Sequence, residues 1–359
     1  MKAEIRAMVL RAPQRLELES FERPRIGDDE ALLRVDACGI CGTDAEVLSG
    51  NIPLASAVIP GHEPVGRIEE IGARASKRWQ LSPGDRVVLE AEFGCGRCLG
   101  CLEGSECRIS PGTYGFMPTT LAPSLWGGYA EMLYLPACAV PHKIDARVPP
   151  RIAALYNALG AGFAWAVAAP GLRVGDSIAI FGPGQRGLAC VLAARQAGAS
   201  RVFVTGMGSR DGAKLALARE LGAELAIDVE REDPVERIRA ATGGAGVDVV
   251  VDTTPHAAQP VHDAVRVARL GGTIVLAGLK GRGVPDFPTD EIAMRRLTIR
   301  GVRAVDHRSF RQAIALIESG RQPLERLHTH HFPLAEAGEA VRTLTESAER
   351  AAIAITIEP

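Results

Sequence analysis

The stretch that decides the fold reads Ser177-Ile-Ala-Ile-Phe-Gly-Pro-Gly-Gln-Arg-Gly187. Its first five residues predict a buried β-strand, and an apolar helix is expected at 188–196, directly after the glycines. The alternation of strand and alanine-rich helix continues to about residue 295, with further strands expected at 202–205, 247–252 and 273–277. Such alternation specifies a parallel sheet covered by helices on both faces. The fold class of this part of the chain is therefore α/β.

The glycines between this strand and helix predict a binding site. Gly182 permits a tight turn, Gly184 lets the backbone approach a pyrophosphate, and Gly187 lets helix and strand pack closely. Gln185 and Arg186 lie between them, where the free N–H groups of the helix start would meet the anion. Because a strand precedes the glycines and a helix follows them, the stretch predicts binding of a dinucleotide, NAD or NADP.

The choice between NAD and NADP depends on the end of the second strand. An acidic residue there would hold the ribose hydroxyls of NAD, but the chain has Gly206. Gly206 leaves space, and Ser209, Arg210 and Lys214 are candidates to bind the 2′-phosphate of NADP. Alternatively, Asp211 could reach back and bind NAD. Arg210 could also be a solvated loop charge without a role in binding. The sequence leans to NADP.

The 359 residues exceed what one hydrophobic core usually organises, so two domains are expected. Residues 1–155 are rich in glycine, proline and short β-type runs, such as 31–36, 66–71 and 85–90, which is typical of an irregular barrel. Residues 156–295 form the nucleotide-binding domain. Residues 296–359, with a strand at 297–302, helices at 310–318 and 334–345 and a strand at 351–357, are expected to rejoin the first domain.

Composition excludes several classes of protein. The net charge of −2 offers no basic surface for nucleic acid, and no apolar run reaches the roughly 18 residues that a membrane span needs. The N-terminal residues 1–10 carry charges throughout and lack the apolar core of a signal peptide. We therefore expect a globular cytoplasmic protein without nucleic-acid or membrane partners.

Four cysteines lie within residues 94–108, at Cys95, Cys98, Cys101 and Cys107. Two-residue gaps separate the first three, so a tight turn can direct their sulfurs at one tetrahedral ion, and Cys107 completes the set. Four thiolates suit Zn²⁺. Disulfides are the alternative, but in a reducing compartment clustered cysteines are more often ligands. The segment therefore predicts a structural zinc lobe.

A second metal site is indicated by Cys38-Gly-Ile-Cys41-Gly-Thr43-Asp44 and by Gly61-His62-Glu63. Cysteine and histidine are ligands of catalytic zinc, and the glycine-rich turns allow their side chains to converge. Taken alone, one buried cysteine and one histidine are more often core residues than ligands. The rest of the chain decides between the two interpretations.

These motifs, with Gly127-Gly-Tyr-Ala-Glu131, the glycine stretch and Leu221-Gly-Ala223, resemble the zinc-dependent alcohol dehydrogenase family of the medium-chain dehydrogenase/reductase superfamily. The resemblance covers nearly the whole chain. It implies a GroES-like catalytic domain interrupted by a Rossmann domain, two zinc ions per chain and a homodimer or homotetramer. Two zinc ions and NAD(P) are the cofactors it implies.

The resemblance also implies roles for individual residues. Cys41 and His62 would hold the catalytic zinc, Glu63 would be its neighbour and exchange ligand, and Thr43 would hydrogen-bond the alcohol oxygen. Many relatives carry a histidine that passes the alcohol proton to solvent where this chain has Glu46. A carboxylate can do this, although its ordinary pKa of about 4.3 makes it a weaker base near neutrality. Zinc would act as a Lewis acid on the substrate oxygen.

Two departures from the family concern the metals. The family's third ligand to the catalytic zinc is a cysteine, aspartate or glutamate, and the best match here is Asn157. Asparagine offers only a neutral oxygen, so either Glu63 moves in, a water fills the place, or the site binds metal weakly. In the lobe, five residues separate Cys101 from Cys107, where the family usually has seven.

The substrate is the least determined part. Loops at 45–53 and 114–126 are expected to line its pocket, and their aromatic and aliphatic residues favour an apolar or cyclic secondary alcohol over a polyol. Core packing is the alternative role of those side chains. Two other functions stay open: an NADPH-dependent enoyl or quinone reductase without catalytic zinc, and a non-catalytic nucleotide-binding protein. The pocket residues considered are Tyr114, Phe116, Leu121, Leu125 and Trp126.

Overall fold

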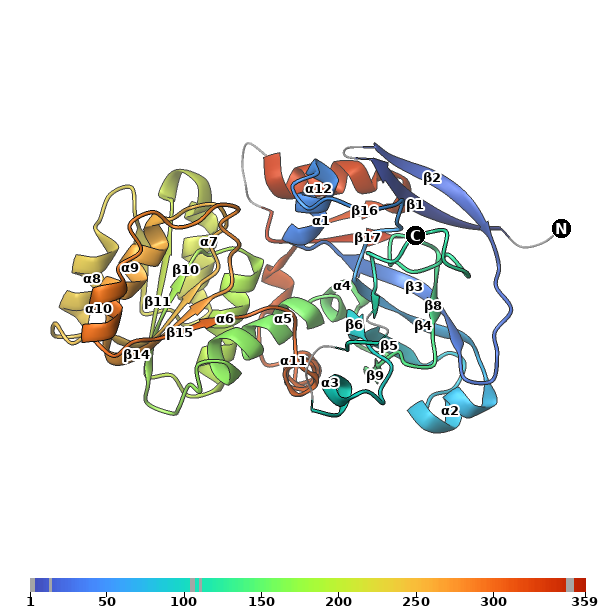
Figure 1. Cartoon of the computed structure of the whole chain (residues 1–359), viewed down its shortest axis with the longest axis horizontal. Coiled ribbons are helices and arrows are strands. Elements are labelled where there is room, and N and C mark those ends of the chain that lie inside the picture. Colours follow the sequence, from blue (N-terminus) through green and yellow to red (C-terminus); the bar gives the residue numbers. More distant parts are fainter. Residues whose placement is uncertain (1–3, 13–14, 104–106, 110–111, 347–351) are drawn as a thin grey trace. The chain divides into compact units, whose positions relative to one another are not determined.

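The computed structural model describes residues 4–12, 15–103, 107–109, 112–346 and 352–359. Residues 104–106 of the cysteine lobe and Ala351 of the expected terminal strand lie outside these ranges. The chain forms two compact units, residues 1–157 with 314–359, and residues 158–313 (Figure 1). It passes into the second unit within helix α5 (Tyr156–Phe163) and leaves it within α11 (His307–Glu318).

The second unit ends at residue 313, whereas the sequence placed its end at 295. Strand β15 (Thr298–Gly301), expected to begin the returning segment, instead pairs in parallel with β14 (Ala268–Leu276). Thr273 lies opposite Thr298 in this pairing, so the strand adds to the sheet of the second unit. The chain returns to the first unit only within α11.

The second unit contains a six-stranded parallel sheet, in the order β12-β11-β10-β13-β14-β15. Its strands are short runs rich in valine and isoleucine, and every residue of β10 is buried. The chain winds outwards from β10 in both directions, so a switch point of the strand order lies at the carboxyl end of β10. The other strands are β11 (Arg201–Gly206), β12 (Leu225–Asp228) and β13 (Val247–Asp252), and β10 spans Ser177–Phe181.

Helices cover this sheet as the sequence predicts. Helices α6 and α7 contact each other, as do α8 and α9, and the two pairs lie on opposite sides of the sheet (Figure 1). Asp233 caps α8 by accepting hydrogen bonds from the backbone N–H groups of Val235 and Glu236. The helices are α6 (Gln185–Gln196), α7 (Gly208–Glu220), α8 (Pro234–Ala241), α9 (Gln259–Val267) and α10 (Thr289–Met294), with a π-helical turn, η1 (Ala164–Ala168).

The first unit is built on a seven-stranded sheet, in the order β16-β17-β3-β4-β5-β9, with β8 paired to β3. Strands expected at 31–36, 66–71 and 85–90 are present as β3, β4 and β5. The C-terminal strand β17 pairs with β3, and β1 and β2 form a separate hairpin. The strands are β1 (Glu4–Ala12), β2 (Arg15–Glu22), β3 (Ala31–Gly39), β4 (Glu63–Ile71), β5 (Arg86–Leu89), β6 (Glu92–Phe93), β7 (Gly112–Thr113), β8 (Met132–Leu135), β9 (Pro141–Lys143), β16 (His328–Pro333) and β17 (Ala354–Glu358).

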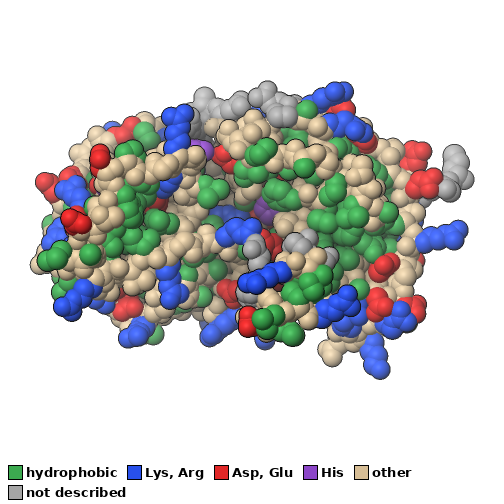
Figure 2. Space-filling model, in the orientation of Figure 1, with side chains coloured by type: hydrophobic (Ala, Val, Ile, Leu, Met, Phe, Trp, Pro, Cys, Tyr) green, Lys and Arg blue, Asp and Glu red, His purple; other side chains and the backbone are tan. Residues whose placement is uncertain are grey.

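Helices of the first unit are short and lie at the ends of its strands. Helix α1 (Gly42–Ser49) begins directly after β3, and α12 (Ala337–Glu346) packs against α1 and β17. Acidic and basic side chains are interspersed over the face in Figure 2, consistent with the small net charge. Among the described residues, no helix has the length and apolar character needed to cross a bilayer. The other helices are α2 (Ala73–Trp79), α3 (Leu99–Leu102), α4 (Pro150–Ala153), η2 (Leu324–Arg326) and η3 (Leu334–Glu336).

Candidate active site

Three potential metal ligands meet where β3 ends and β4 begins. Donor atoms of Cys41, His62 and Glu63 all lie within 4.8 Å of one another, and all three residues are buried. The strand register explains this convergence, because Gly39 lies opposite Glu63 in the antiparallel pair. The residues just after β3 therefore lie beside those just before β4. A sulfur, an imidazole nitrogen and a carboxylate oxygen in a shielded site are a donor set that suits Zn²⁺.

Asp44 joins two of these ligands. The backbone N–H of Cys41 donates to Asp44 Oδ2 at 2.9 Å, and Asp44 Oδ1 lies 3.5 Å from His62 Nδ1. His62 Nδ1 thus faces the Asp44 carboxylate at ion-pair distance. Asp44 was not among the residues predicted to act in this site. Its signal was the capping-box spacing, since Asp44 is the third residue of a helix capped by Cys41.

The electrostatics of this site favour a cation. Burial disfavours protonation of His62, but the negative charge of Asp44 and the thiol of Cys41 outweigh burial and raise the pKa of His62 well above its usual value. Burial, with a further contribution from Asp44, raises the pKa of the neighbouring Cys38 thiol. The ligand cluster therefore sits in a negative field that a zinc ion would neutralise.

Asn157 contacts the cluster through Glu63. Its side-chain Nδ2 donates to Glu63 Oε1 at 2.7 Å, and both residues are buried. An amide nitrogen has no lone pair for a metal, so this contact orients the carboxylate. Asn157 as a direct ligand stays a prediction that the hydrogen bond does not favour.

Thr43 and Glu46 lie three residues apart on α1 and therefore share a face of the helix. Thr43 Oγ1 is 3.3 Å from Cys41 Sγ, so the hydroxyl adjoins the ligand cluster. Glu46 Oε2 accepts a hydrogen bond of 2.9 Å from Asn51 Nδ2. Both side chains are half-buried. A hydroxyl beside the metal site and a carboxylate one turn further along are arranged for moving a proton.

The four lobe cysteines also converge. Their sulfurs all lie within 4.8 Å of one another, with Cys98 Sγ 3.5 Å from Cys101 Sγ and 3.9 Å from Cys107 Sγ. No disulfide is formed by the cysteines that the structure describes. Hydrogen bonds from the backbone N–H groups of Cys101 and Arg108 lower the pKa of Cys98, which favours its thiolate. The shorter spacing before Cys107 still brings the sulfurs to one point.

The glycine stretch has the geometry its sequence predicts. Gly182 has φ of +94°, which residues with side chains rarely adopt. A Cβ on Gly187 would fall 1.9 Å from Gly182 O, whereas one on Gly184 would meet no atom within 4 Å. Gly184 caps α6, so the space beside it adjoins free N–H groups at a helix start. That space fits a pyrophosphate.

Comparisons with known proteins match most of the chain to two described families. Residues 27–145 match the family described as alcohol dehydrogenase GroES-like domain, and residues 187–319 match the zinc-binding dehydrogenase family. The chain is 43% identical to "Probable alcohol dehydrogenase adh" of Mycobacterium tuberculosis over 348 residues, 95% of each chain. The chain belongs to the zinc-dependent medium-chain alcohol dehydrogenases.

Two further relatives extend this comparison. An erythritol/L-threitol dehydrogenase of Mycolicibacterium smegmatis is 32% identical, covering 93% of this chain and 92% of the relative. An NADP-bound protein of Sinorhizobium meliloti 1021 matches all of both chains, with a TM-score of 0.86 and 29% identity. This alcohol dehydrogenase therefore has a GroES-like unit and a Rossmann unit, uses zinc and NAD(P), and acts on a small-molecule alcohol. That activity replaces the reductase and the non-catalytic alternatives.

At the end of β11, the residues predicted to bind the 2′-phosphate make contacts with neighbouring carboxylates. Ser209 Oγ donates to Glu230 Oε1 at 2.8 Å, so it is already bonded to a carboxylate. Arg210 Nε lies 4.0 Å from Asp211 Oδ1, and half of the Arg210 side chain is exposed. These contacts do not support the lean to NADP. Arg186 lies with its guanidinium 5.0 Å from the ring centroid of Trp165.

Most of the side chains expected to line the substrate pocket belong to the core instead. Tyr114, Leu125 and Trp126 are buried, and the indole N–H of Trp126 donates to Leu121 O. Aromatic packing explains the difference, because the Trp126 ring stacks on Phe93 at 6.2 Å. Phe116 lies against the predicted metal site, with its ring centroid 5.9 Å from that of His62.

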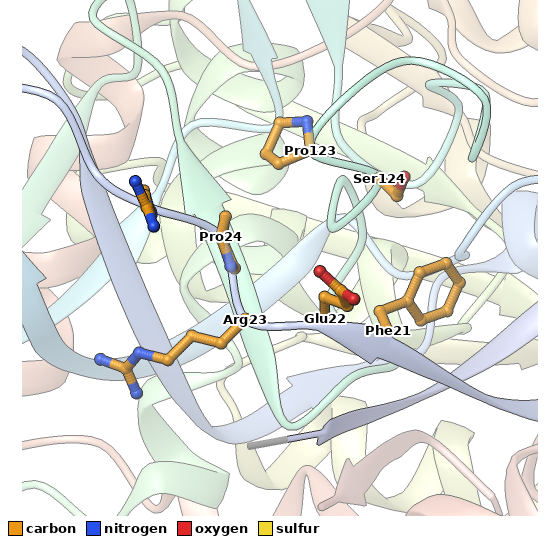
Figure 3. A pocket seen from close by; sticks show the side chains of 7 residues that line it. Phe21, Glu22, Arg23, Pro24, Pro123 and Ser124 are labelled. Atoms are coloured by element: carbon orange, nitrogen blue, oxygen red, sulfur yellow. The ribbon is translucent and has the colours of Figure 1, made fainter. Parts of the chain in front are cut away.

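A pocket of about 570 Å³ lies elsewhere on the first unit (Figure 3). Arg23, one of its lining residues, bonds to Glu69 at 3.3 Å and Glu70 at 3.0 Å, so its charge is compensated. None of the lining residues is a metal ligand of this alcohol dehydrogenase, and we do not assign the substrate to this pocket. The lining residues are Phe21, Glu22, Arg23, Pro24, Arg25, Pro123 and Ser124.

Proposed function

We propose that this enzyme oxidises secondary alcohols, or reduces the matching ketones, at a site formed by Cys41, His62 and Glu63. The buried convergence of these three donors, two of them tied together by Asp44, is the observation that carries the proposal. A bound Zn²⁺ would supply Lewis-acid chemistry, lowering the pKa of the alcohol so that hydride can leave to the nicotinamide. Glu63 is the third protein ligand in this proposal, and Asn157 holds it in place.

The proton of the alcohol leaves through Thr43 and Glu46. The Thr43 hydroxyl adjoins the metal ligands, so it is placed to hydrogen-bond the substrate oxygen and receive its proton. Glu46, one turn along α1, is placed to accept the proton and pass it to water. Asn51 keeps the Glu46 carboxylate oriented through its 2.9 Å hydrogen bond.

An apolar substituent on the substrate carbon is supported by Phe116. This ring tilts against His62 and also packs with an apolar cluster that contains Val47 and Ile52. Such a surface favours an aliphatic or cyclic ketone over a sugar alcohol. A polyol is the second candidate, because the M. smegmatis relative is named for erythritol and L-threitol.

Zinc analysis and a substrate panel test this proposal together. We expect two zinc ions per chain, and turnover of cyclic and aliphatic secondary alcohols with a higher kcat/KM than erythritol or sorbitol. Cys41→Ala and His62→Ala should each remove one zinc and lower kcat/KM by at least ~10³-fold. Cys190→Ala, which removes a buried thiol from α6, is the matched control. It should keep both zinc ions and the kcat/KM of the wild type.

Two results would contradict the proposal. Full activity of Cys41→Ala and His62→Ala would exclude the ligand cluster as the catalytic centre. Higher kcat/KM for polyols than for apolar alcohols would favour the second candidate. Thr43→Ser should retain most activity and Thr43→Ala should lose it, because only the former keeps the hydroxyl.

Subunits would pair along β15, giving a homodimer or a tetramer of two such pairs. Support comes from the position of β15 at the edge of the six-stranded sheet, with its residues mostly exposed. An edge strand offers unpaired backbone groups to a second copy. Met294, 80% exposed and shortly before β15 in the chain, would be covered by such pairing. Sedimentation of the wild type and of Ile299→Pro tests this, since a strand proline removes a backbone donor.

A further inference from the structure

We infer that Asp228 and Glu230 select NAD(H) over NADP(H) in this enzyme, which is the opposite of the coenzyme preference predicted from the end of β11. The inference rests on a dinucleotide binding at Gly182–Gly187 as proposed above. The acid missing from the end of β11 is supplied by the next strand, β12, and by the residues that follow it.

The strand register places Asp228 where the ribose acid is expected. Gly182 N–H donates to Thr205 O at 3.0 Å, so the end of β11 adjoins the glycine stretch. Gly206 pairs with Asp228 in the parallel register of β11 and β12. A Cβ on Gly206 would fall 2.7 Å from Pro183 Cγ, which keeps this strand end close to the pyrophosphate turn. The adenosine ribose of a dinucleotide extends from that turn towards the end of the second strand.

Two carboxylates occupy the start of α7. Gly208 N–H donates to Asp228 Oδ1 at 2.7 Å, and Ser209 N–H donates to Glu230 Oε2 at 2.7 Å. The Ser209 hydroxyl donates to the other Glu230 oxygen. These N–H groups are the donors that a 2′-phosphate would need at a helix start. Here they are already bonded to negative charges.

Gly208 fits this arrangement. A Cβ at this position would lie 2.0 Å from Asp228 Oδ2, so a side chain would push the carboxylate away. Because Gly208 has no side chain, Asp228 can approach the start of the helix closely. The backbone N–H of Glu230 also donates a 3.1 Å hydrogen bond to Asp228 Oδ1. Two backbone N–H groups, those of Gly208 and Glu230, therefore fix the position of the Asp228 carboxylate.

Neighbouring cations do not reverse the charge at this end of the sheet. Arg231 Nε lies 3.4 Å from Asp228 Oδ2, and Lys214 Nζ lies 3.4 Å from Asp211 Oδ1. Arg210 also has Asp211 nearby, at 4.0 Å. Each cation therefore has a carboxylate within reach. A phosphate carrying about two negative charges would have to displace Asp228 or Glu230 and bear their repulsion, whereas ribose hydroxyls can donate to the same oxygens.

Titration calorimetry of the purified enzyme with NADH and NADPH tests the inference without using activity. We expect the wild type to bind NADH at least ~10-fold more tightly than NADPH, because like charges placed together cost several kcal/mol. Asp228→Asn and Glu230→Gln should each reduce that ratio at least ~3-fold, mainly by tightening NADPH. Glu230 is exposed, so its variant tests the inference even if Asp228→Asn fails to fold.

Glu232→Gln is the matched control. Glu232 lies on the same loop but pairs with Arg237 at 2.7 Å, so its variant should keep the wild-type ratio. If the wild type binds NADPH as tightly as NADH or more tightly, the inference is wrong but the dinucleotide site stands. The same holds if the ratio of NADH to NADPH affinity is unchanged in both test variants. Failure of both coenzymes to bind would overturn the dinucleotide site and the inference with it.

Discussion

The side-chain amide of Asn157 donates a 2.7 Å hydrogen bond to Oε1 of Glu63, and both residues are buried beside Cys41 and His62. A neutral residue thus stands at the position where the family resemblance predicts a charged third ligand. The hydrogen bond from Asn157 fixes the carboxylate of Glu63, the proposed third ligand of the metal. The negative charge of the third ligand would then come from β4 instead of from the start of α5.

Asn157→Ala should weaken zinc binding at the catalytic site. Removing a hydrogen bond to a buried charged group costs roughly 1.5–3 kcal/mol, or about 10–100-fold in affinity. The two proteins are compared by native mass spectrometry after mild chelation that leaves two zinc ions in the wild type. We expect Asn157→Ala to retain only one zinc ion, that of the cysteine lobe.

Asn157→Asp serves as the matched variant. It places a charged oxygen next to the same cluster and should retain zinc through the chelation step, because a second carboxylate adds a donor that zinc prefers. Wild-type zinc retention in Asn157→Ala would contradict the supporting role of Asn157.

Cys98→Ser should destabilise the protein without acting on the chemistry. In the part of the lobe that the structure describes, Leu99 and Leu102 are about 70% exposed and so bury little apolar surface. We therefore expect a bound metal to supply much of its stability, because metal-binding energy contributes to folding. We expect the melting temperature to fall by at least ~5 °C. Cys138→Ser, outside the four-cysteine cluster, should change it little, and an unchanged melting temperature of Cys98→Ser would argue against a structural zinc.

The parts of the site that the sequence predicted are those encoded locally. The lobe cysteines lie within thirteen residues and the glycine turn within six, so each group is brought together by its own short segment. The α/β pattern was equally readable, because period and strand length repeat through the second unit. These features need no knowledge of distant contacts.

The remaining parts depend on strand register, which the sequence does not reveal. Asp228 reaches Gly208 across twenty residues, because β11 and β12 pair with Gly206 opposite Asp228. Trp126 belongs to the core rather than to the pocket because Phe93, far back in the chain, stacks on it. Neither contact leaves a periodic or spacing signal in its own segment.

Gly184→Ala separates coenzyme binding from folding. The residue has φ of −65° and ψ of 179°, which alanine can adopt, and an added Cβ would meet no protein atom within 4 Å. The methyl group would instead occupy the space assigned to the pyrophosphate. We expect an unchanged melting temperature and at least ~10-fold weaker NADH binding.

Gly212→Ala is the control for that variant. Gly212 is exposed on α7 and also has no atom within 4 Å of an added Cβ. Alanine there should raise helix stability slightly and leave the dissociation constant of NADH unchanged. Wild-type NADH affinity in Gly184→Ala would remove the pyrophosphate from this turn.

His328 should make the stability of the first unit depend on pH. Burial, with repulsion from Arg151, lowers the pKa of His328 to about 4, and its Nε2 lies 3.0 Å from Thr356 Oγ1. The unfolded chain, with a histidine pKa of about 6.5, binds the proton more readily than the folded chain. The contribution of neutral His328 to the free energy of unfolding is therefore complete above pH of about 6.5 and is lost as the pH falls towards 4.

We expect His328→Gln, which cannot titrate, to show a smaller drop in melting temperature than the wild type between pH 7 and about 4.5. A drop in His328→Gln as large as that of the wild type would show that His328 titrates alike in the folded and unfolded states.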